Sequence, residues 1–301
     1  MSGSVGSRAA GSSDVGLFFL DELERFAAAD RSSSPAALRG SLLEYLRSVQ
    51  ALQPTMALVH QLAARALAVA DAGLARGDSA AELRVELARS CAAERADLEA
   101  GLRAVAAIAV ELLGERGAWI ATLSSSGAVR AALVEAGRAG RAPRVLVGEG
   151  RPRLEGRLMA EALAGAGIET WLVVDAALPL LVSQARAVWI GADAVTERGV
   201  LNKVGSYALA LAAREHSVPV YALAGRRKFL PAATAALRIA EMPADEVWDP
   251  PAPGVRLRNI YFELVPLELL RGVVVEDGVL GPREAETVAR ERPLPAELAG
   301  A

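Results

Sequence analysis

The stretch Val188-Trp-Ile-Gly-Ala-Asp-Ala-Val-Thr-Glu-Arg-Gly-Val-Leu-Asn-Lys-Val-Gly-Ser-Tyr207 decides how the rest of the chain is interpreted. Its pattern predicts a buried strand over 187–191, an acid, Asp193, at the strand's carboxyl end, a turn at Arg198-Gly199 and a helix from about Lys203. Ligands of open α/β sheets bind at the carboxyl ends of strands. Asp193 with the following Asn202 and Lys203 therefore indicates a site for a phosphorylated or hydroxylated small molecule. The alternative is a surface turn in which Asp193 only caps.

Lysine is rare in this chain. Of the 33 Lys and Arg residues, only Lys203 and Lys228 are lysines. An ammonium is a compact point charge, whereas a guanidinium is a planar fork. Lysine in an arginine-rich chain therefore indicates positions where a point charge is needed. For Lys228, within Gly225-Arg-Arg-Lys-Phe229, the alternative is an ordinary loop lysine.

The composition excludes several classes of protein. The 301 residues are enough for two domains, and the net charge of −3 with no sustained basic run gives no case for direct nucleic-acid binding. The single cysteine, Cys91, excludes an intrachain disulfide and suits a reducing compartment. No apolar run approaches the roughly 18 residues that span a bilayer. We expect a cytoplasmic protein that uses no cofactor and no metal.

The first third of the chain has a helical pattern. Residues 1–13 are rich in Gly and Ser and are predicted to be a disordered tail. Apolar residues recur at helical spacing over 15–29 and again over 79–113. Between them, Ser34 as the cap and Pro35 in the first turn predict the start of another helix. Pro54 should interrupt this pattern. We therefore predict a helical domain over 14–115.

After residue 116 the pattern changes to short apolar runs bounded by Gly, Pro or charge. These runs, predicted to be strands, begin near Trp119, Val145, Trp171, Val188, Val218 and Val273, with helical patterns at 127–139, 155–167 and 203–215. Alternating units of this length predict a mostly parallel sheet with helices on both faces. The fold class is therefore α/β, with a helical domain followed by a second domain over 116–301.

Two loops after predicted strands carry candidate ligand-binding groups. Ser124, Ser125, Ser126 and Gly127 lie between a strand and a helix, where hydroxyl and N–H groups form an anion site. The alternative is N-capping by one serine. Arg151 lies in a glycine-punctuated loop suited to bidentate phosphate binding, although any arginine of this chain could be a surface residue. Asp175, after the strand near Trp171, is either a site residue or a helix cap.

These segments, in this order, resemble one superfamily. It joins the regulatory subunits of translation initiation factor 2B, ribose-1,5-bisphosphate isomerase and methylthioribose-1-phosphate isomerase. The matching stretches are Gln53-Pro54-Thr55, Thr122 to Ser126, Gly150-Arg151-Pro152 to Gly156, Gly191-Ala192-Asp193 with Asn202-Lys203-Val204-Gly205, Lys228-Phe229, and Asn259 to Pro266. The resemblance implies a Rossmann-like second domain and a homodimer or higher oligomer.

The resemblance also implies roles for site residues. In the isomerases a Cys and an Asp face the substrate; Asp193 matches that Asp, and Ser124 stands in place of the Cys. Arg151, Asn202 and Lys203 match ligand-binding positions, and Lys228 matches the Lys of a Lys-Phe pair. Gln53 replaces an arginine, and the isomerases' Arg-Gly-Ala motif has no clear match.

Two hypotheses follow. The chain binds a phosphorylated sugar or nucleotide, and would act as an aldose–ketose isomerase if Ser124 supports the chemistry. Alternatively, it is a non-catalytic regulatory subunit that acts through protein contacts.

Overall fold

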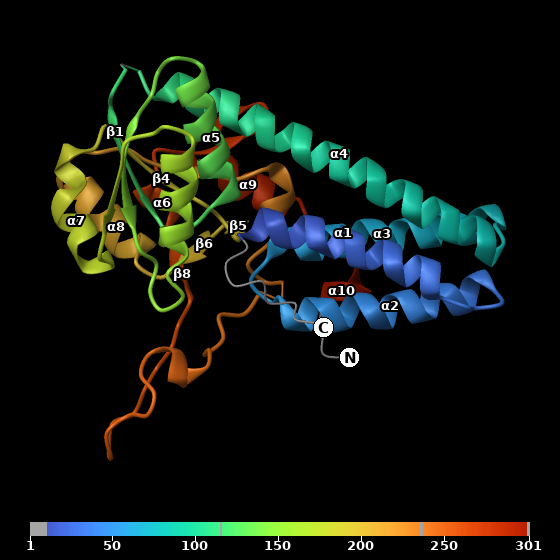
Figure 1. Cartoon of the computed structure of the whole chain (residues 1–301). Coiled ribbons are helices and arrows are strands. Elements are labelled where there is room, and N and C mark those ends of the chain that lie inside the picture. The colour runs from blue at the N-terminus through green and yellow to red at the C-terminus, as the bar shows by residue number, and fades with distance from the viewer. Residues whose placement is uncertain (1–10, 115, 235–236, 300–301) are drawn as a thin grey trace.

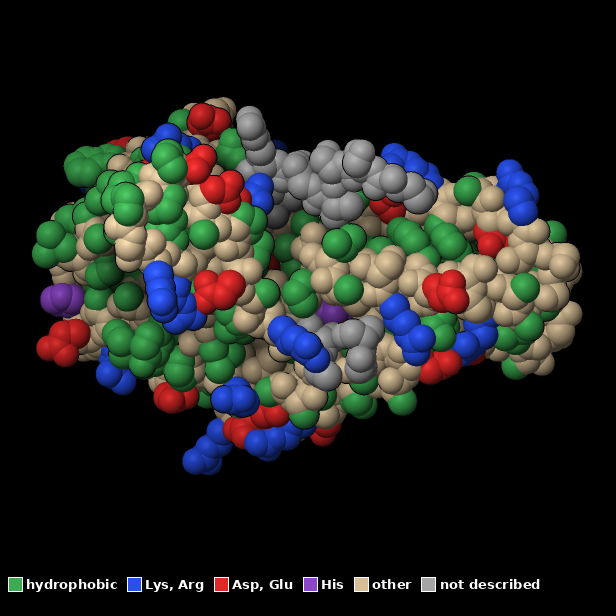
Figure 2. Space-filling model, turned by 90° about the horizontal axis from the view of Figure 1, so that it is seen from below, with side chains coloured by type: hydrophobic (Ala, Val, Ile, Leu, Met, Phe, Trp, Pro, Cys, Tyr) green, Lys and Arg blue, Asp and Glu red, His purple; other side chains and the backbone are tan. Residues whose placement is uncertain are grey.

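A computed structural model describes residues 11–114, 116–234 and 237–299. An elongated group of helices is followed by a mostly parallel sheet covered by helices (Figure 1), which confirms the predicted fold class. On the face seen in Figure 2, acidic and basic side chains are interspersed over both parts.

The helical region contains α1 (Ser12–Ala29), α2 (Pro35–Leu52), α3 (Ala57–Arg76) and α4 (Ala80–Leu112). Their apolar stripes form one core, in which Leu20, Leu38, Leu42 and Leu62 are almost fully buried. The tail predicted over 1–13 is too long by two residues, because Ser12 and Ser13 are helical; residues 1–10 lie outside the described chain. No helix among the described residues is long and apolar enough to cross a membrane.

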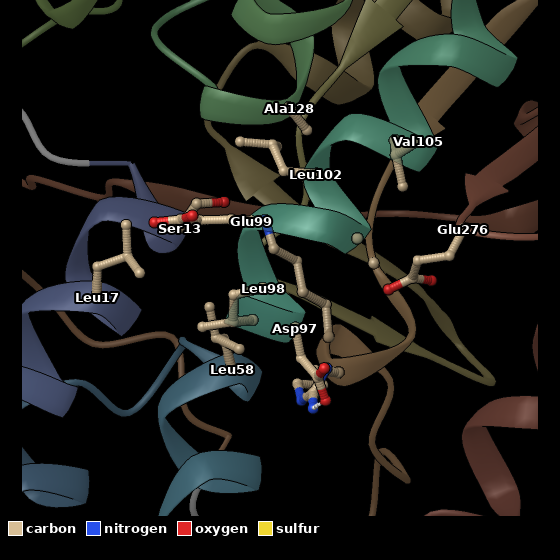
Figure 3. A pocket seen from close by; sticks show the side chains of 14 residues that line it. Ser13, Leu17, Leu58, Asp97, Leu98, Glu99, Leu102, Val105, Ala128 and Glu276 are labelled. Carbon is tan, nitrogen blue, oxygen red and sulfur yellow. Dashed lines mark hydrogen bonds and ion pairs between the residues drawn. The ribbon is translucent and has the colours of Figure 1, made fainter. Parts of the chain in front are cut away.

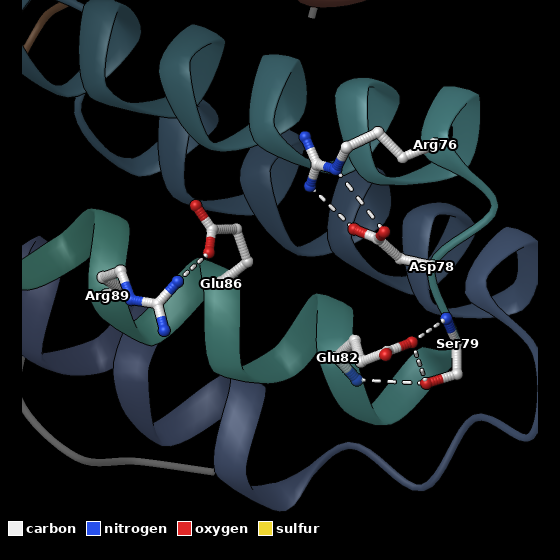
Figure 4. A network of polar contacts seen from close by, with 6 residues as sticks. All are labelled: Arg76, Asp78, Ser79, Glu82, Glu86 and Arg89. Atoms are coloured by element: carbon white, nitrogen blue, oxygen red, sulfur yellow. Dashed lines mark hydrogen bonds and ion pairs between the residues drawn. The ribbon is translucent and has the colours of Figure 1, made fainter.

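Polar contacts fix the turn between α3 and α4 (Figure 4). Gly77 ends α3 in the left-handed conformation, at φ 79°, which glycine adopts without a steric penalty. Ser79 and Glu82 then form a capping box at the start of α4. Arg76 and Asp78 form an ion pair at 2.7 Å beside it. The local sequence thus determines where α4 begins.

The main sheet has seven strands in the order β10-β9-β7-β4-β1-β2-β3, all parallel except β10. The strands are β1 (Trp119–Leu123), β2 (Arg144–Gly148), β3 (Thr170–Val173), β4 (Ala187–Ile190), β7 (Val220–Leu223), β9 (Gly272–Val275) and β10 (Gly278–Leu280). Most residues of β1, β2, β4 and β9 are buried, as continuous apolar runs in a parallel sheet require.

Helices cover both faces of this sheet (Figure 1). One face carries α5 (Gly127–Arg138), α6 (Glu155–Gly165) and the C-terminal part of α4. The other carries α7 (Leu178–Leu181), α8 (Ser206–Glu215) and α9 (Pro282–Arg290). The 33-residue α4 therefore packs in both halves of the molecule. The short α10 (Ala296–Ala299) returns to the helical region, where Leu298 is buried.

A small antiparallel sheet corrects one prediction. It contains β5 (Ala194–Thr196), β6 (Gly199–Lys203) and β8 (Phe262–Val265), in the order β5-β6-β8. Lys203 therefore ends a strand, and α8 begins only at Ser206 instead of the predicted Lys203. The chain turns at Gly205, at φ 101°, and Glu263 of β8 accepts hydrogen bonds from the N–H groups of Gly205, the N-cap of α8, and Tyr207. The pairing of β6 with β8, distant in sequence, overrides the local helical pattern.

The strand order reverses between β1 and β4. From β1 the chain runs outward through β2 and β3, whereas β7 and β9 lie beyond β4 on the other side. At such a switch point the loops after the two strands separate and leave a crevice at their carboxyl ends. Ser124 follows β1 and Gly191 follows β4, so the fold brings both predicted loops to this crevice.

Candidate functional site

A pocket, here called the front pocket, lies at the switch point. Ser124, Ser125, Ser126, Asp193, Asn202 and Lys203, all predicted from the sequence as site residues, line it. Gly11, Ser12 and Glu155 also line it, and the sequence did not single them out as site residues. Among the described residues no group of three or more His, Cys, Asp or Glu side chains is placed to hold a metal ion.

Asp193 is the buried acid of the front pocket. Its backbone is held from two sides: its N–H donates to Leu201 at 2.8 Å, and its carbonyl accepts from Ala57 of α3 at 2.9 Å. Burial raises the pKa of its carboxyl to about 6, although Lys228, Lys203 and a hydrogen bond from Ser12 act in the opposite direction. A carboxyl in this range can both hold and release a proton near neutral pH.

Lys228 supplies a buried ammonium behind Asp193. Its Nζ donates hydrogen bonds to Ser12 Oγ and to the Ala192 carbonyl, both at 2.8 Å. Ser12 Oγ donates to the same carbonyl at 3.1 Å, so Ser12 connects α1 to the loop after β4. Burial lowers the pKa of Lys228, while the charge of Asp193 raises it. The two buried charges stabilise each other.

Lys228 also lines a second cavity, shown in Figure 3. Leucines of α3 and α4, among them Leu58, Leu98 and Leu102, line it as well. These leucines keep water from the lysine, although Glu276 also lines the cavity and its charge raises the pKa of Lys228. The surroundings therefore explain why burial is the largest effect on the pKa of Lys228.

Lys203 is the second buried ammonium, and it lines the front pocket itself. Its Nζ donates to Glu155 Oε1 at 2.6 Å and lies 4.8 Å from the centre of the Tyr261 ring. The other carboxylate oxygen of Glu155 is buried and has no hydrogen-bond partner. Asn202, beside Lys203, donates to Ser206 Oγ at 2.8 Å. The front pocket is thus lined by one ammonium group and two carboxylates, whereas the predicted ligand-binding residue Lys228 lies outside its lining, hydrogen-bonded to Ala192 behind Asp193.

Ser124 lies where β1 ends, in a left-handed backbone conformation at φ 63°. This conformation is unfavourable for a residue with a side chain, and such strain gathers at functional sites. Gly150 lies against it: a Cβ on Gly150 would be 3.1 Å from Ser124 Cβ. Asp175 accepts the N–H groups of Gly150 and Arg151 at 2.8 and 2.7 Å. Asp175 therefore holds the loop beside Ser124. It is neither the front-pocket residue nor the helix cap that the sequence predicted.

Two helix N-termini meet at the serine loop. Ser126 caps α5, and its Oγ accepts from Val129 N–H at 3.5 Å. The N-cap of α1, Gly11, lies close by, because a Cβ placed on it would be 3.3 Å from the Ser125 carbonyl and 3.6 Å from Gly127 N. Each helix start carries partial positive charge and free N–H groups, so their convergence favours an anion. Ser126 is thus both a cap and a pocket residue.

The structure does not bring Arg151 into the front pocket. Its side chain is exposed, and its guanidinium donates to the Val247 carbonyl at 3.3 Å. Sequence reasoning missed Ser12 and Glu155. Gly11-Ser12-Ser13 before an apolar helix was a helix-start signal that was assigned to the tail. Glu155 carried no comparable signal, because only the tertiary fold shows that it meets Lys203.

Comparisons with known proteins agree with this architecture. The model of the initiation factor 2 subunit family matches residues 8–282. A translation initiation factor eIF-2B subunit 2-like protein of Pyrococcus furiosus is 31% identical over 263 residues, which are 86% of this chain and 88% of that protein. Ribose 1,5-bisphosphate isomerase of Archaeoglobus fulgidus is 34% identical over 182 residues, 58% of this chain and 57% of the isomerase. The solved translation initiation factor eIF-2B of Pyrococcus horikoshii OT3 has a TM-score of 0.78 at 26% identity, covering 92% of this chain and 94% of that chain.

Gly191 gives a test of how tightly the front pocket is packed. A Cβ at this position would lie 2.7 Å from both Cβ and Oγ of Ser126 and 3.4 Å from Asn202 Oδ1. Gly40, on the exposed side of α2, has nothing within 4 Å of such an atom. The two glycines therefore form a matched pair for substitution by alanine.

We predict that Gly191→Ala lowers the free energy of unfolding by about 1–3 kcal/mol, because the new methyl group displaces the cap of α5. Gly40→Ala should raise it by up to about 1 kcal/mol, since alanine is the better helix former. Urea denaturation of both variants and the wild type measures this. Equal stabilities for the two variants would show that the loop after β4 accommodates a side chain.

Proposed function

The chain belongs to the initiation factor 2 subunit family, and we propose that its front pocket binds a phosphorylated small molecule, either a sugar phosphate or a nucleotide. The observation that carries this proposal is the buried Asp193 carboxyl, placed between Lys228 and Lys203 where the N-termini of α1 and α5 converge. A neutral apolar ligand would leave the N–H groups at these helix starts and the second carboxylate oxygen of Glu155 without partners.

The phosphate would bind at the converging helix starts. The backbone of Ser125 and Ser126 provides N–H groups there, and the buried Lys203 adds a positive charge. Gly127, also predicted as a ligand-binding residue, lies beside Gly11 but outside the lining of the pocket. The unpartnered oxygen of Glu155 and the side chain of Asn202 would then accept and donate hydrogen bonds to sugar hydroxyl groups. This assignment leaves Arg151 outside the binding set.

Aldose–ketose isomerisation is the chemistry that the pocket best suits. It moves a hydrogen from C2 to C1 of the sugar. In ribose-1,5-bisphosphate O1 carries a phosphate, so the C1–O4 ring bond breaks, O2 loses its proton as it becomes the ketone oxygen, and O4 gains one. The reaction therefore needs a group that accepts and returns a proton. Asp193 is placed to do this, because its pKa of about 6 lies near neutral pH. Ser124 would hold a sugar oxygen through its hydroxyl. The resemblance implies that ribose-1,5-bisphosphate isomerase and methylthioribose-1-phosphate isomerase have a Cys at this position. Turnover by this chain would therefore depend more heavily on Asp193 than turnover by those isomerases does.

A regulatory role is the second candidate. The serine at position 124 favours it, since a hydroxyl is a much weaker acid than a thiol. So does the extent of the Pyrococcus furiosus match, because it spans 88% of that eIF-2B subunit 2-like protein. Under this proposal the front pocket senses its ligand, and a protein partner binds the outer surface.

We predict that ribose-1,5-bisphosphate or a related pentose phosphate raises the melting temperature of the wild type, because a ligand of the native state stabilises it. Asp193→Asn should keep the fold, change this shift and abolish isomerisation, since the amide accepts no proton. If the wild type turns over, its rate should fall as pH drops below about 6, where the carboxylate is lost. A thermal-shift panel, followed by a coupled isomerase assay, measures these effects. Undiminished turnover in Asp193→Asn would remove this residue from the mechanism.

We predict that Ser124→Cys raises the isomerisation rate with ribose-1,5-bisphosphate, because a thiol with a pKa near roughly 8.5 releases its proton far more readily than a hydroxyl. Ser125→Cys, one residue away in the same pocket, is the matched control and should show no gain. Equal rates in wild type and Ser124→Cys, with ligand binding intact, would favour the regulatory role.

We also propose that the chain forms a homodimer or a higher oligomer. Residues 237–260 extend away from the sheet (Figure 1) and expose Ile239, Val247, Trp248 and Val255. Sedimentation velocity should give a mass of at least twice the 31.3 kDa of one chain, and Trp248→Ser should shift the distribution towards the monomer. A monomeric wild type at micromolar concentration would contradict this.

A further inference from the structure

A second charged cleft lies on the other side of the turn that carries Lys228. Arg65 of α3, Arg226 and Arg227 of the short helix η3 (Arg226–Lys228), and Arg292 after α9 line it. Gln61, Glu276 and Asp277 complete its lining, and its cavity volume is about 470 Å³. We call this the arginine cleft. It shares no lining residue with the front pocket.

Three of the four arginines have carboxylate partners that hold them at the cleft. Arg226 binds Asp277 through Nε and one terminal nitrogen, at 3.0 and 2.7 Å. Arg65 and Arg227 share one buried carboxylate, that of Glu94, at 3.0 and 2.7 Å. A single negative charge thus holds two guanidinium groups from different halves of the molecule. Arg227 also reaches Asp97 at 3.1 Å.

Arg292 is the exception. Its guanidinium donates to the carbonyl of Arg226 at 3.1 Å and forms no ion pair with a carboxylate in the described part of the chain. Burial lowers its pKa most and the charge of Arg226 lowers it further; Glu276 raises it, and Arg227 adds a smaller lowering effect. A half-buried cation therefore faces two other cations across the cleft. An anion between them would relieve this repulsion.

We propose that the arginine cleft binds the phosphoryl group of a small phosphorylated metabolite, at a site separate from the front pocket. Guanidinium groups recognise phosphate through paired N–H bonds, and Arg65 and Arg292 keep N–H groups that no carboxylate of the described residues contacts. Gln61, whose amide already lies at the cleft, adds a neutral polar neighbour. This site goes beyond the proposed function, because it uses none of the residues assigned there.

The arginine cleft is connected to the front pocket through the turn that carries Lys228. Arg226 and Arg227 precede Lys228 on the same single turn, and the ammonium of Lys228 hydrogen-bonds Ser12 and the Ala192 carbonyl behind Asp193. Glu276 receives the Arg226 N–H at 2.9 Å and holds the start of this turn. An anion bound to the arginines would thus contact the same turn that positions Lys228.

Pyrophosphate is the probe for this site. Its binding is measured by calorimetry at constant ionic strength with the wild type, Arg65→Gln, Arg292→Gln and Arg138→Gln. The Arg65 and Arg138 side chains are 64% and 75% exposed, so their loss does not threaten the fold, and Arg138 lies on α5 away from the cleft. Lys203→Gln removes an ammonium of the front pocket.

We expect Arg65→Gln and Arg292→Gln each to weaken pyrophosphate binding by about tenfold, the effect of one lost charge-assisted hydrogen bond. Arg138→Gln should bind as the wild type does, and Lys203→Gln should keep the component that the cleft variants lose. The proposal is overturned if the wild type does not bind pyrophosphate. It is also overturned if both cleft variants bind it normally, if Arg138→Gln weakens binding equally, or if only Lys203→Gln does. Should Arg292→Gln fail to fold, the Arg65→Gln result decides.

Discussion

Asp193 carries a carboxylate into the protein interior, where an unpaired ion would be destabilising by several kcal/mol. Two ammonium groups and a hydroxyl from three separate segments compensate for this charge: Lys203 on β6, Lys228 on η3 and Ser12 on α1. The compensation is incomplete, because burial still raises the pKa of the carboxyl to about 6. That residual imbalance suits the proposed chemistry, since a fully paired carboxylate would hold no proton near neutral pH.

The same charge joins the two halves of the molecule. The helical region supplies the start of α1 at the serine loop and the N–H of Ala57 that binds the Asp193 carbonyl. The sheet supplies the crevice between β1 and β4. Because α4 packs in both cores, the halves are held in one arrangement, and neither half alone contains the front pocket. Displacement of α1 would expose Asp193 and leave Lys228 without its hydroxyl partner.

The two sides of the site differ in how closely they follow the resemblance to sugar-phosphate isomerases. The Asp193, Asn202 and Lys203 side keeps the residue types, and the structure gathers them at one pocket. On the other side a serine stands where the resemblance implies a cysteine, and its backbone is in the left-handed conformation, supported by Gly150 and, behind it, Asp175. The hydroxyl of Ser124 is a much weaker acid than a thiol. This contrast is why ligand binding and turnover are separate questions for this protein.

The sequence by itself determined the helical region, the parallel strands of the main sheet and the candidate pocket residues after β1 and β4, because these depend on local periodicity, caps and the few lysines. Strand-end placement then brought Ser124 and Asp193 together, since parallel strands end at one edge. Tertiary contacts decided the rest. The pairing of β6 with β8 made Lys203 a strand residue, docking of α1 brought Ser12 to the Ala192 carbonyl beside Asp193, and the salt bridge to Glu155 placed Lys203. The hydrogen bond to the Val247 carbonyl holds the Arg151 guanidinium outside the front pocket. Each of these contacts joins residues far apart in the chain, so no local pattern records it.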